Sequence, residues 1–175
     1  MARPKKPENE DLFDNGLDPV KRVVWLTGDI DLDTTVKCLK GLSVLDRLSE
    51  DPIILMINSE GGDMVQGFAI IDAISHCRSQ VIGVVRGNAQ SAAFVILQSC
   101  HVRRASKHAV LMTHAGTRSS EFDLKIDMNA DEIILRRARE KNPLMTMNKL
   151  QKWQACDKYM LADEAKQMGF LDEVY

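Results

Sequence analysis

The sequence lacks several features that would assign it at once to a class of protein. Its four cysteines, Cys38, Cys77, Cys100 and Cys156, are scattered and form no Cys-x-x-Cys pair. We therefore expect reduced thiols in a cytoplasmic protein. No apolar run is long enough to span a bilayer, and residues 1–7 have no apolar core of the kind found in secretory signals.

A large excess of charge of one sign is also missing. The formal net charge is −2 at pH 7, which argues against nucleic acid or an anionic membrane as the main partner. The length of 175 residues and the hydrophobic content of 45% predict one domain with an ample core. We assign residues 1–19, which are rich in proline, asparagine and charge, to a mobile tail and residues 20–175 to the domain.

Within the domain, apolar and β-branched runs alternate with helical patterns. Four runs predict strands at residues 22–27, 53–57, 81–85 and 109–113. Each of the first three is followed by apolar residues at helical spacing, so we predict a parallel α/β sheet. Two short helices at 146–155 and 162–168 and an edge strand at 170–174 complete the expected order.

The segment between residues 120 and 140 carries two conflicting patterns. Four apolar residues alternate strictly with polar ones, which predicts a half-buried strand: Phe122, Leu124, Ile126 and Met128. Residues 131–140 instead have a helical pattern. We therefore expect a strand that runs into a helix.

Ser91 lies where the predicted third strand passes into an apolar helix. At such a turn the free N–H groups of the first helical residues and the helix dipole favour negative charge. A nucleophile elbow uses the same geometry, although the spacing around Ser91 is not Gly-x-Ser-x-Gly. For this stretch alone, a serine that only caps the helix is the more common structure.

Two further turns follow strands in the same way. Gly61 and Gly62 lie between a strand and a helix, where a peptide or an oxyanion can approach backbone N–H groups closely; no Gly-Lys-Ser/Thr follows, so this is not a Walker loop. His114 ends the fourth strand. Because the ends of parallel strands gather at one sheet edge, Gly62, Ser91 and His114 can converge there. A serine nucleophile needs a neutral imidazole and a buried carboxylate to orient it.

These motifs resemble a known family in order and approximate spacing. Residues 57–62, 87–92 and 111–114 resemble the Clp protease proteolytic subunit family, ClpP, as do residues 22–28 at its first strand and 157–165 with 169–172 at its end. The resemblance implies that Ser91 is the nucleophile, His114 the base and Asp157 the orienting acid. By itself, Asp157 has the pattern of a solvated surface charge.

The resemblance also implies the surroundings of this triad. The N–H groups of Gly62 and Ala92 would form the oxyanion hole, and Gly61, Gly62, Ala115 and Gly116 would lie against the substrate. The family resemblance further implies an α/β, crotonase-like fold of repeated β-β-α and βαβ units with a protruding strand–helix handle. We also expect stacked heptameric rings that cleave peptides or unfolded proteins, a partner that is an ATP-dependent unfoldase, and no cofactor.

The chain departs from the family pattern at several positions. The usual proline before the double glycine is Glu60, the usual Gln-Pro after the histidine is Ala115-Gly116, and the arginine before the acid is Cys156. These changes leave the proposed triad intact. They concern the substrate path and the contacts between rings.

Other interpretations are weaker but remain open. His76, Cys77, Cys100 and His101 lack ordinary zinc-ligand spacing, so we expect no metal. Acyl-CoA chemistry on the same fold, or a non-catalytic ring component, would not need a serine nucleophile. Covalent labelling by a fluorophosphonate separates these alternatives from a serine hydrolase.

Overall fold

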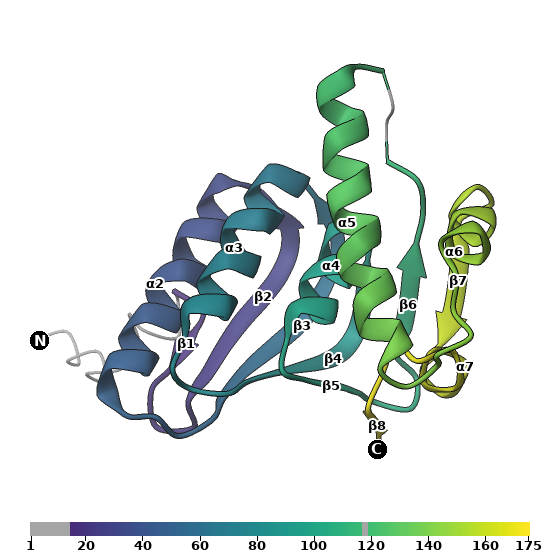
Figure 1. Cartoon of the computed structure of the whole chain (residues 1–175). Helices are drawn as coiled ribbons and strands as arrows, with labels where there is room; N and C mark the ends of the chain where they lie inside the picture. Colours follow the sequence, from purple (N-terminus) through teal and green to yellow (C-terminus); the bar gives the residue numbers. More distant parts are fainter. Residues whose placement is uncertain (1–14, 117–118) are drawn as a thin grey trace, which may run out of the picture.

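The computed structural model describes residues 15–116 and 119–175. Its strands are β1 (Leu17–Asp18), β2 (Val23–Ile30), β3 (Ile53–Gly62), β4 (Val81–Gln90), β5 (Val102–Ala105), β6 (Val110–Thr113), β7 (Lys158–Leu161) and β8 (Glu173–Val174). Its helices are α2 (Leu32–Leu48), α3 (Met64–His76), α4 (Ala92–Ser99), α5 (Glu121–Arg139), α6 (Met147–Gln154) and α7 (Ala162–Met168). The predicted α/β class is confirmed (Figure 1).

The strands form one eight-stranded sheet in which β4 is the branching strand. The main path runs β1-β2-β3-β4-β5-β8, and the pairs from β2 to β5 are parallel, as expected. The first half of β4 pairs with β5, whereas its last residues, Asn88–Gln90, pair with β6. β7 then pairs antiparallel with β6. The branch places the ends of β4, β6 and β7 close together.

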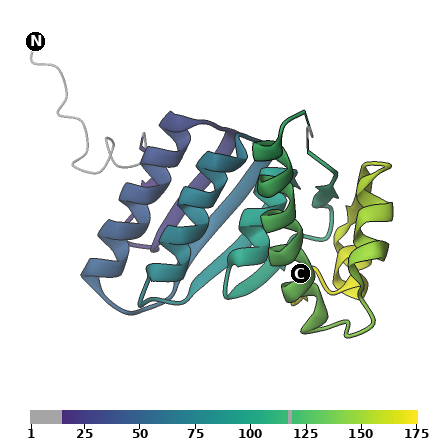
Figure 2. The ribbon, with the colours of Figure 1, turned by 45° about the horizontal axis from the view of Figure 1, so that its top comes forward.

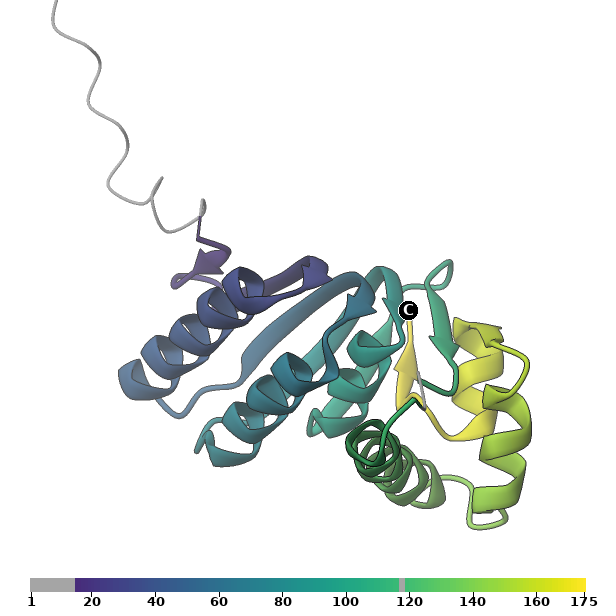
Figure 3. The same cartoon turned by 90° about the horizontal axis from the view of Figure 1, so that it is seen from above.

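Three helices lie side by side over one face of the sheet. Figures 2 and 3 show α2, α3 and α4 in a row, with the segment from α6 to α7 beside β6 at the far end. Residues 92–98 of α4 are all buried, because α4 packs against α3, β3 and α5. Phe94 of α4 meets Phe170 edge to face at 5.2 Å between ring centroids. The apolar pattern after Ser91 therefore belongs to a core helix.

The folded part of the chain begins before residue 20. Leu17 and Asp18 of β1 pair with Val24 and Val23, and Leu17 belongs to the core. The Asp18 carboxylate accepts from the N–H groups of Val20 and Lys21, which turns the chain into β2. The predicted tail is therefore too long at its C-terminal end. Residues 1–14 of that tail lie outside the described residues.

The alternating run at residues 122–128 is helical, so the predicted strand is wrong. Ser120 caps α5, since its Oγ accepts from the Asp123 N–H at 3.1 Å. Lys125 and Glu121, four residues apart, form an ion pair at 2.8 Å that supports the first turns. On a helix the alternation splits into two faces, with Phe122 and Ile126 on one and Leu124 and Met128 on the other.

The expected strand–helix handle is therefore represented, in the described residues, by α5 alone. Its N-terminal end projects beyond the sheet and the other helices (Figure 1). Residues 117 and 118, which precede it, are not described. Other predicted boundaries also differ from the structure. The first predicted strand ends at residue 27, but Gly28 and Asp29 lie inside β2 at a register shift. The edge strand predicted at 170–174 is limited to β8, and β5 was not predicted.

A buried ion pair joins β5 to the C-terminal segment. The fully buried Arg103 guanidinium donates to both carboxylate oxygens of Asp172 at 3.0 and 2.9 Å. It also donates to Gln98 Oε1 and to the carbonyl of Gly169. Burial raises the pKa of Asp172, but these hydrogen bonds and the Arg103 charge outweigh that effect and lower its pKa to about 2. The carboxylate is therefore held in its ionised form.

Replacing Asp172 with asparagine should destabilise the protein by about 3 kcal/mol at pH 7, because it leaves the Arg103 charge buried and unpaired. Because the pKa of Asp172 is lowered from an ordinary value of about 3.9, its ionised carboxylate stabilises the fold above about pH 4. This stabilisation is lost as the pH falls towards 2 and the carboxylate becomes protonated. In urea unfolding, the difference in the free energy of unfolding between the wild type and Asp172→Asn should thus be constant from pH 7 to pH 5. It should become smaller below pH 4. Glu50→Gln, which removes an exposed ion pair with Arg78, is the control with a small loss.

Candidate active site

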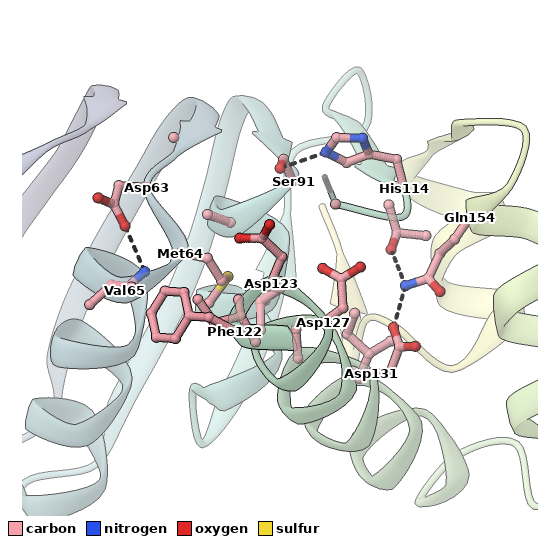
Figure 4. Close-up of a pocket in the computed structure, with 18 residues that line it drawn as sticks. Asp63, Met64, Val65, Ser91, His114, Phe122, Asp123, Asp127, Asp131 and Gln154 are labelled. Atoms are coloured by element: carbon pink, nitrogen blue, oxygen red, sulfur yellow. Dashed lines mark hydrogen bonds between the residues drawn. The ribbon is translucent and has the colours of Figure 1, made fainter. Parts of the chain in front are cut away.

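Ser91 adopts a strained conformation at the junction of β4 and α4. Its φ of 49° and ψ of −123° lie outside the usual regions for a residue with a side chain. Its Oγ makes no capping bond to α4 and is instead 2.8 Å from His114 Nε2 (Figure 4). The simple capping role is therefore wrong, and the hydroxyl faces an imidazole, as in a nucleophile elbow.

Of the two glycines at the end of β3, Gly61 packs directly against this elbow and Gly62 packs against the end of β2. A Cβ at Gly61, whose φ is 107°, would lie 2.7 Å from Ser91 Cβ and 2.9 Å from the Gln90 carbonyl. A Cβ at Gly62, whose φ is 146°, would lie 2.5 Å from the Ile30 carbonyl oxygen. Neither position has room for a side chain. Gly61 therefore allows the end of β3 to lie close to the elbow, and Gly62 allows it to lie close to the end of β2.

Gly62 and Ala92 both line the pocket that contains Ser91. Ala92 is the first residue of α4, and N–H groups in the first turn of a helix have no acceptor within it. Their placement is compatible with the predicted oxyanion hole. The oxyanion role itself stays a prediction.

Strand pairing brings His114 to Ser91. β6 pairs with β4 through Ala89–Leu111 and Gln90–Met112, and the Ser91 N–H donates to the Met112 carbonyl at 3.0 Å. His114 directly follows β6, so its ring lies beside the elbow. About a third of the His114 side chain is exposed (33%), which leaves the imidazole open to the pocket.

Asp157 lies on the other side of the imidazole. It precedes β7, which pairs with β6 through Thr113 and Lys158, and this pairing brings its carboxylate near the ring. Asp157 Oδ1 is 3.8 Å from His114 Nδ1, beyond hydrogen-bond distance, and 63% of its side chain is exposed. The structure therefore brings the predicted acid to the site, but as an exposed carboxylate instead of the expected buried one.

The pocket beside Ser91 has a volume of about 400 Å³ (Figure 4). Apolar side chains from three helices form part of its wall: Met64, Val95, Ile126 and Ile134. Gly116, predicted to contact the substrate, also lines it. Ala115 and Gly61 do not: the Ala115 N–H donates to the Gln154 carbonyl at 3.1 Å, and Gly61 lies behind the elbow.

Sequence reasoning missed the polar residues of this pocket. Asp123, Asp127 and Asp131 of α5 and Gln154 of α6 all line it. The Gln154 amide donates to Asp131 at 2.7 Å and to Thr113 Oγ1 at 3.3 Å. The four-residue spacing of the aspartates is a signal, but it indicates one face only after residues 121–139 are known to be helical.

The other residues considered from sequence serve the fold. Cys100 Sγ donates to the Ile96 carbonyl, and His101 Nδ1 accepts from the Val81 N–H. Burial raises the pKa of the Cys38 and Cys100 thiols to about 12. In residues 15–116 and 119–175, no group of three His, Cys, Asp or Glu side chains could hold a metal ion. No helix of these two ranges is long and apolar enough to cross a membrane.

A serine hydrogen-bonded to a histidine where the strands of an α/β sheet end is characteristic of serine-type hydrolases. Comparison with family models matches residues 10–175 to the Clp protease family. The chain therefore belongs to the Clp protease family and is a serine-type peptidase. The resemblance seen in the sequence motifs is confirmed.

Individual relatives agree with this assignment. The chain is 30% identical over 167 residues to ATP-dependent Clp protease proteolytic subunit 3 of Synechococcus sp. (strain CC9605), a match that covers 89% of this chain and 82% of the relative. The crystal structure of the ClpP protease catalytic domain from Plasmodium falciparum superposes with a TM-score of 0.83 at 28% identity. That match covers 100% of this chain and 94% of the solved one.

Substituting Gly61 with alanine should reduce activity about 100-fold, because the added methyl displaces the Ser91 elbow by a distance on the order of 1 Å. Gly28→Ala is the matched control: Gly28 also has a positive φ, of 80°, but a Cβ there meets nothing within 4 Å. Rates of peptide hydrolysis and thermal unfolding are measured for both variants. Both add backbone strain at a positive φ, so a loss of activity seen only in Gly61→Ala reports the displacement of Ser91 by the methyl group. Equal losses in the two would contradict the close packing of Gly61 on the elbow.

Proposed function

We propose that Ser91, His114 and Asp157 are the catalytic triad of this peptidase. The observation that carries the proposal is the 2.8 Å contact between Ser91 Oγ and His114 Nε2, made by a serine that does not cap its helix. Distances of this length allow direct proton transfer between a hydroxyl and an imidazole.

In the proposed mechanism, His114 Nε2 takes the Ser91 proton while Oγ attacks the carbonyl carbon of a peptide bond. The N–H groups of Gly62 and Ala92 stabilise the oxyanion that forms. The C–N bond then breaks as His114 gives its proton to the leaving amine, and the acyl group remains as an ester on Ser91. Water, deprotonated by His114, attacks this ester. The bond between the acyl carbon and Ser91 Oγ then breaks, Oγ takes the proton back from His114, and the carboxylic acid leaves.

Asp157 is the orienting acid in this proposal. A carboxylate beside Nδ1 favours the tautomer with a proton on Nδ1, which leaves Nε2 free to accept from Ser91. At 3.8 Å the contact is an ion pair once the imidazole is protonated. Because 63% of the Asp157 side chain is exposed, water screens this interaction, and the contact must shorten to become a hydrogen bond.

The substrates in this proposal are peptides and unfolded proteins, and the partner is an ATP-dependent unfoldase. Support comes from the Synechococcus relative, whose name describes it as the proteolytic subunit of an ATP-dependent protease. Homo-oligomeric rings that enclose the sites would protect other proteins of the cell from cleavage. The reduced state predicted for the four cysteines favours the cytoplasm as the location.

The surface for ring contacts in this proposal includes the projecting end of α5. Leu124 and Met128 share one face there, with 45% and 64% of each residue exposed. Ile126, in contrast, lines the pocket and is not suited to this role. Neither acyl-CoA chemistry nor a non-catalytic ring component is favoured by any feature of the site.

Ser91→Ala and His114→Ala should each reduce peptide hydrolysis about 10³-fold or more without unfolding the protein. Asp157→Asn should also reduce the rate strongly, because it favours the wrong imidazole tautomer. Matched controls are Ser99→Ala, at the opposite end of α4, and His108→Ala, in the turn before β6. A fluorogenic peptide assay and fluorophosphonate labelling read out the result. Labelling that persists in Ser91→Ala would assign the nucleophile to another residue.

Met128→Asp should weaken oligomers and peptidase activity together, since a charge buried without a partner in an interface costs several kcal/mol. Gln151→Asp, on the exposed side of α6, adds the same charge as a control. Mass photometry gives the oligomeric state, and a fluorogenic peptide gives the activity. A fully active monomer would rule out the enclosed chamber.

A further inference from the structure

Gln154, the last residue of α6, is a buried polar residue that the proposed mechanism does not use. Only 3% of it is exposed, although it lines the pocket that contains Ser91 and His114. A buried polar side chain is costly unless hydrogen bonds replace those it made to water. The partners of Gln154 therefore indicate which segments of the chain it holds together.

The side-chain amide of Gln154 joins the end of β6 to α5 (Figure 4). Its Nε2 donates to Thr113 Oγ1 at 3.3 Å and to Asp131 Oδ1 at 2.7 Å. Thr113 and Asp131 are themselves only 2% and 4% exposed. An amide nitrogen has two N–H groups, and these two bonds use both of them. The amide therefore serves to connect two elements, and its N–H groups are already engaged when a substrate arrives.

The backbone carbonyl of the same residue joins the segments that carry His114 and Asp157. It accepts from the Ala115 N–H at 3.1 Å and, more weakly, from the Asp157 N–H at 3.4 Å. Thr113 and Ala115 flank His114 in the sequence, so Gln154 binds the chain on both sides of the imidazole. It also binds the residue that supplies the proposed orienting carboxylate.

Asp157 needs such a hold because it is both strained and exposed. Its φ is 46°, its side chain is 63% exposed, and its carboxylate lies 3.8 Å from His114 Nδ1. A residue in a sparsely populated backbone conformation persists only where the surrounding structure imposes that conformation. On one side this structure is β7, through the pairing of Lys158 with Thr113, and on the other side it is the Gln154 carbonyl.

We propose that Gln154 is a positioning residue, which supports catalysis by holding Asp157 beside His114. Its buried amide fixes the end of α6 against β6 and α5, and its carbonyl then fixes the turn that leads to Asp157. Without this hold, the carboxylate moves away from Nδ1 and the favoured imidazole tautomer is lost. The inference rests on the proposed role of Asp157 as the orienting acid.

The first test replaces the amide with an apolar side chain of similar length. Gln154→Met should lower kcat for a fluorogenic peptide about 10- to 100-fold, because a misplacement on the order of 1 Å can cost about 100-fold in rate. KM should stay within about twofold, because the amide N–H groups do not bind the substrate. Gln151→Met, on the exposed side of α6, makes the same change as a control and should keep both constants.

A double-mutant cycle with Asp157→Asn separates positioning from a general loss of structure. If Gln154 acts through Asp157, Gln154→Met should cost about twofold or less in the Asp157→Asn protein, because the group that it positions is already impaired. Thermal unfolding shows whether each variant is folded at the assay temperature. If Gln154→Met is not, Thr113→Val, which removes one partner of the amide, takes its place in the same cycle.

The outcomes separate this inference from the proposed function. Wild-type activity in Asp157→Asn overturns the orienting role of Asp157, and this inference with it, but leaves Ser91 and His114 in their roles. A strong loss in Asp157→Asn, with the same further loss from Gln154→Met in both backgrounds, overturns the positioning role alone. A wild-type kcat in Gln154→Met also overturns it, and a raised KM at that kcat assigns Gln154 to substrate binding.

Discussion

The pairing of β6 with the last three residues of β4 is the constraint on which the site depends. β4 is ten residues long, and β5 covers only its first half, so Asn88–Gln90 remain available to a second neighbour. β6 takes that place and carries His114 to Ser91, and β7 then pairs with β6 and carries Asp157 to His114. The order of the three residues in space is thus set by backbone hydrogen bonds. Side-chain contacts only complete it.

The elbow also shows what such a site costs the fold. Ser91 and Asp157 both have positive φ, and the two glycines beside the elbow allow approaches that no side chain would permit. Strain of this kind costs on the order of 1–3 kcal/mol per residue. Ser91 leads directly into the buried helix α4, whose Phe94 packs on Phe170, and the buried Arg103–Asp172 pair joins β5 to the C-terminal segment. The stability of this core offsets the strain at Ser91.

Two groups of polar side chains lie in the pocket. One is the Ser91–His114 pair, which we propose cleaves the peptide bond, and the other is the row of aspartates on α5. Both groups line one pocket because α5 packs on α4, whose first residue follows Ser91. The projecting end of the same helix exposes Leu124 and Met128. A single helix therefore links the pocket, the core and the surface proposed for assembly.

The sequence by itself determined the α/β class and most strands and helices, and it indicated Ser91 and His114 as candidate catalytic residues, because apolar runs and strand-end motifs are local patterns. It misassigned residues 122–128, since four apolar residues at alternate positions fit a strand and two faces of a helix equally well. Only the tertiary structure decided that Ser91 faces His114 instead of capping α4, that the exposed Asp157 carboxylate lies 3.8 Å from His114 Nδ1, and that Gln154 and three aspartates line the pocket. These properties depend on the packing of segments far apart in the chain, and no local pattern records which side chains that packing brings together.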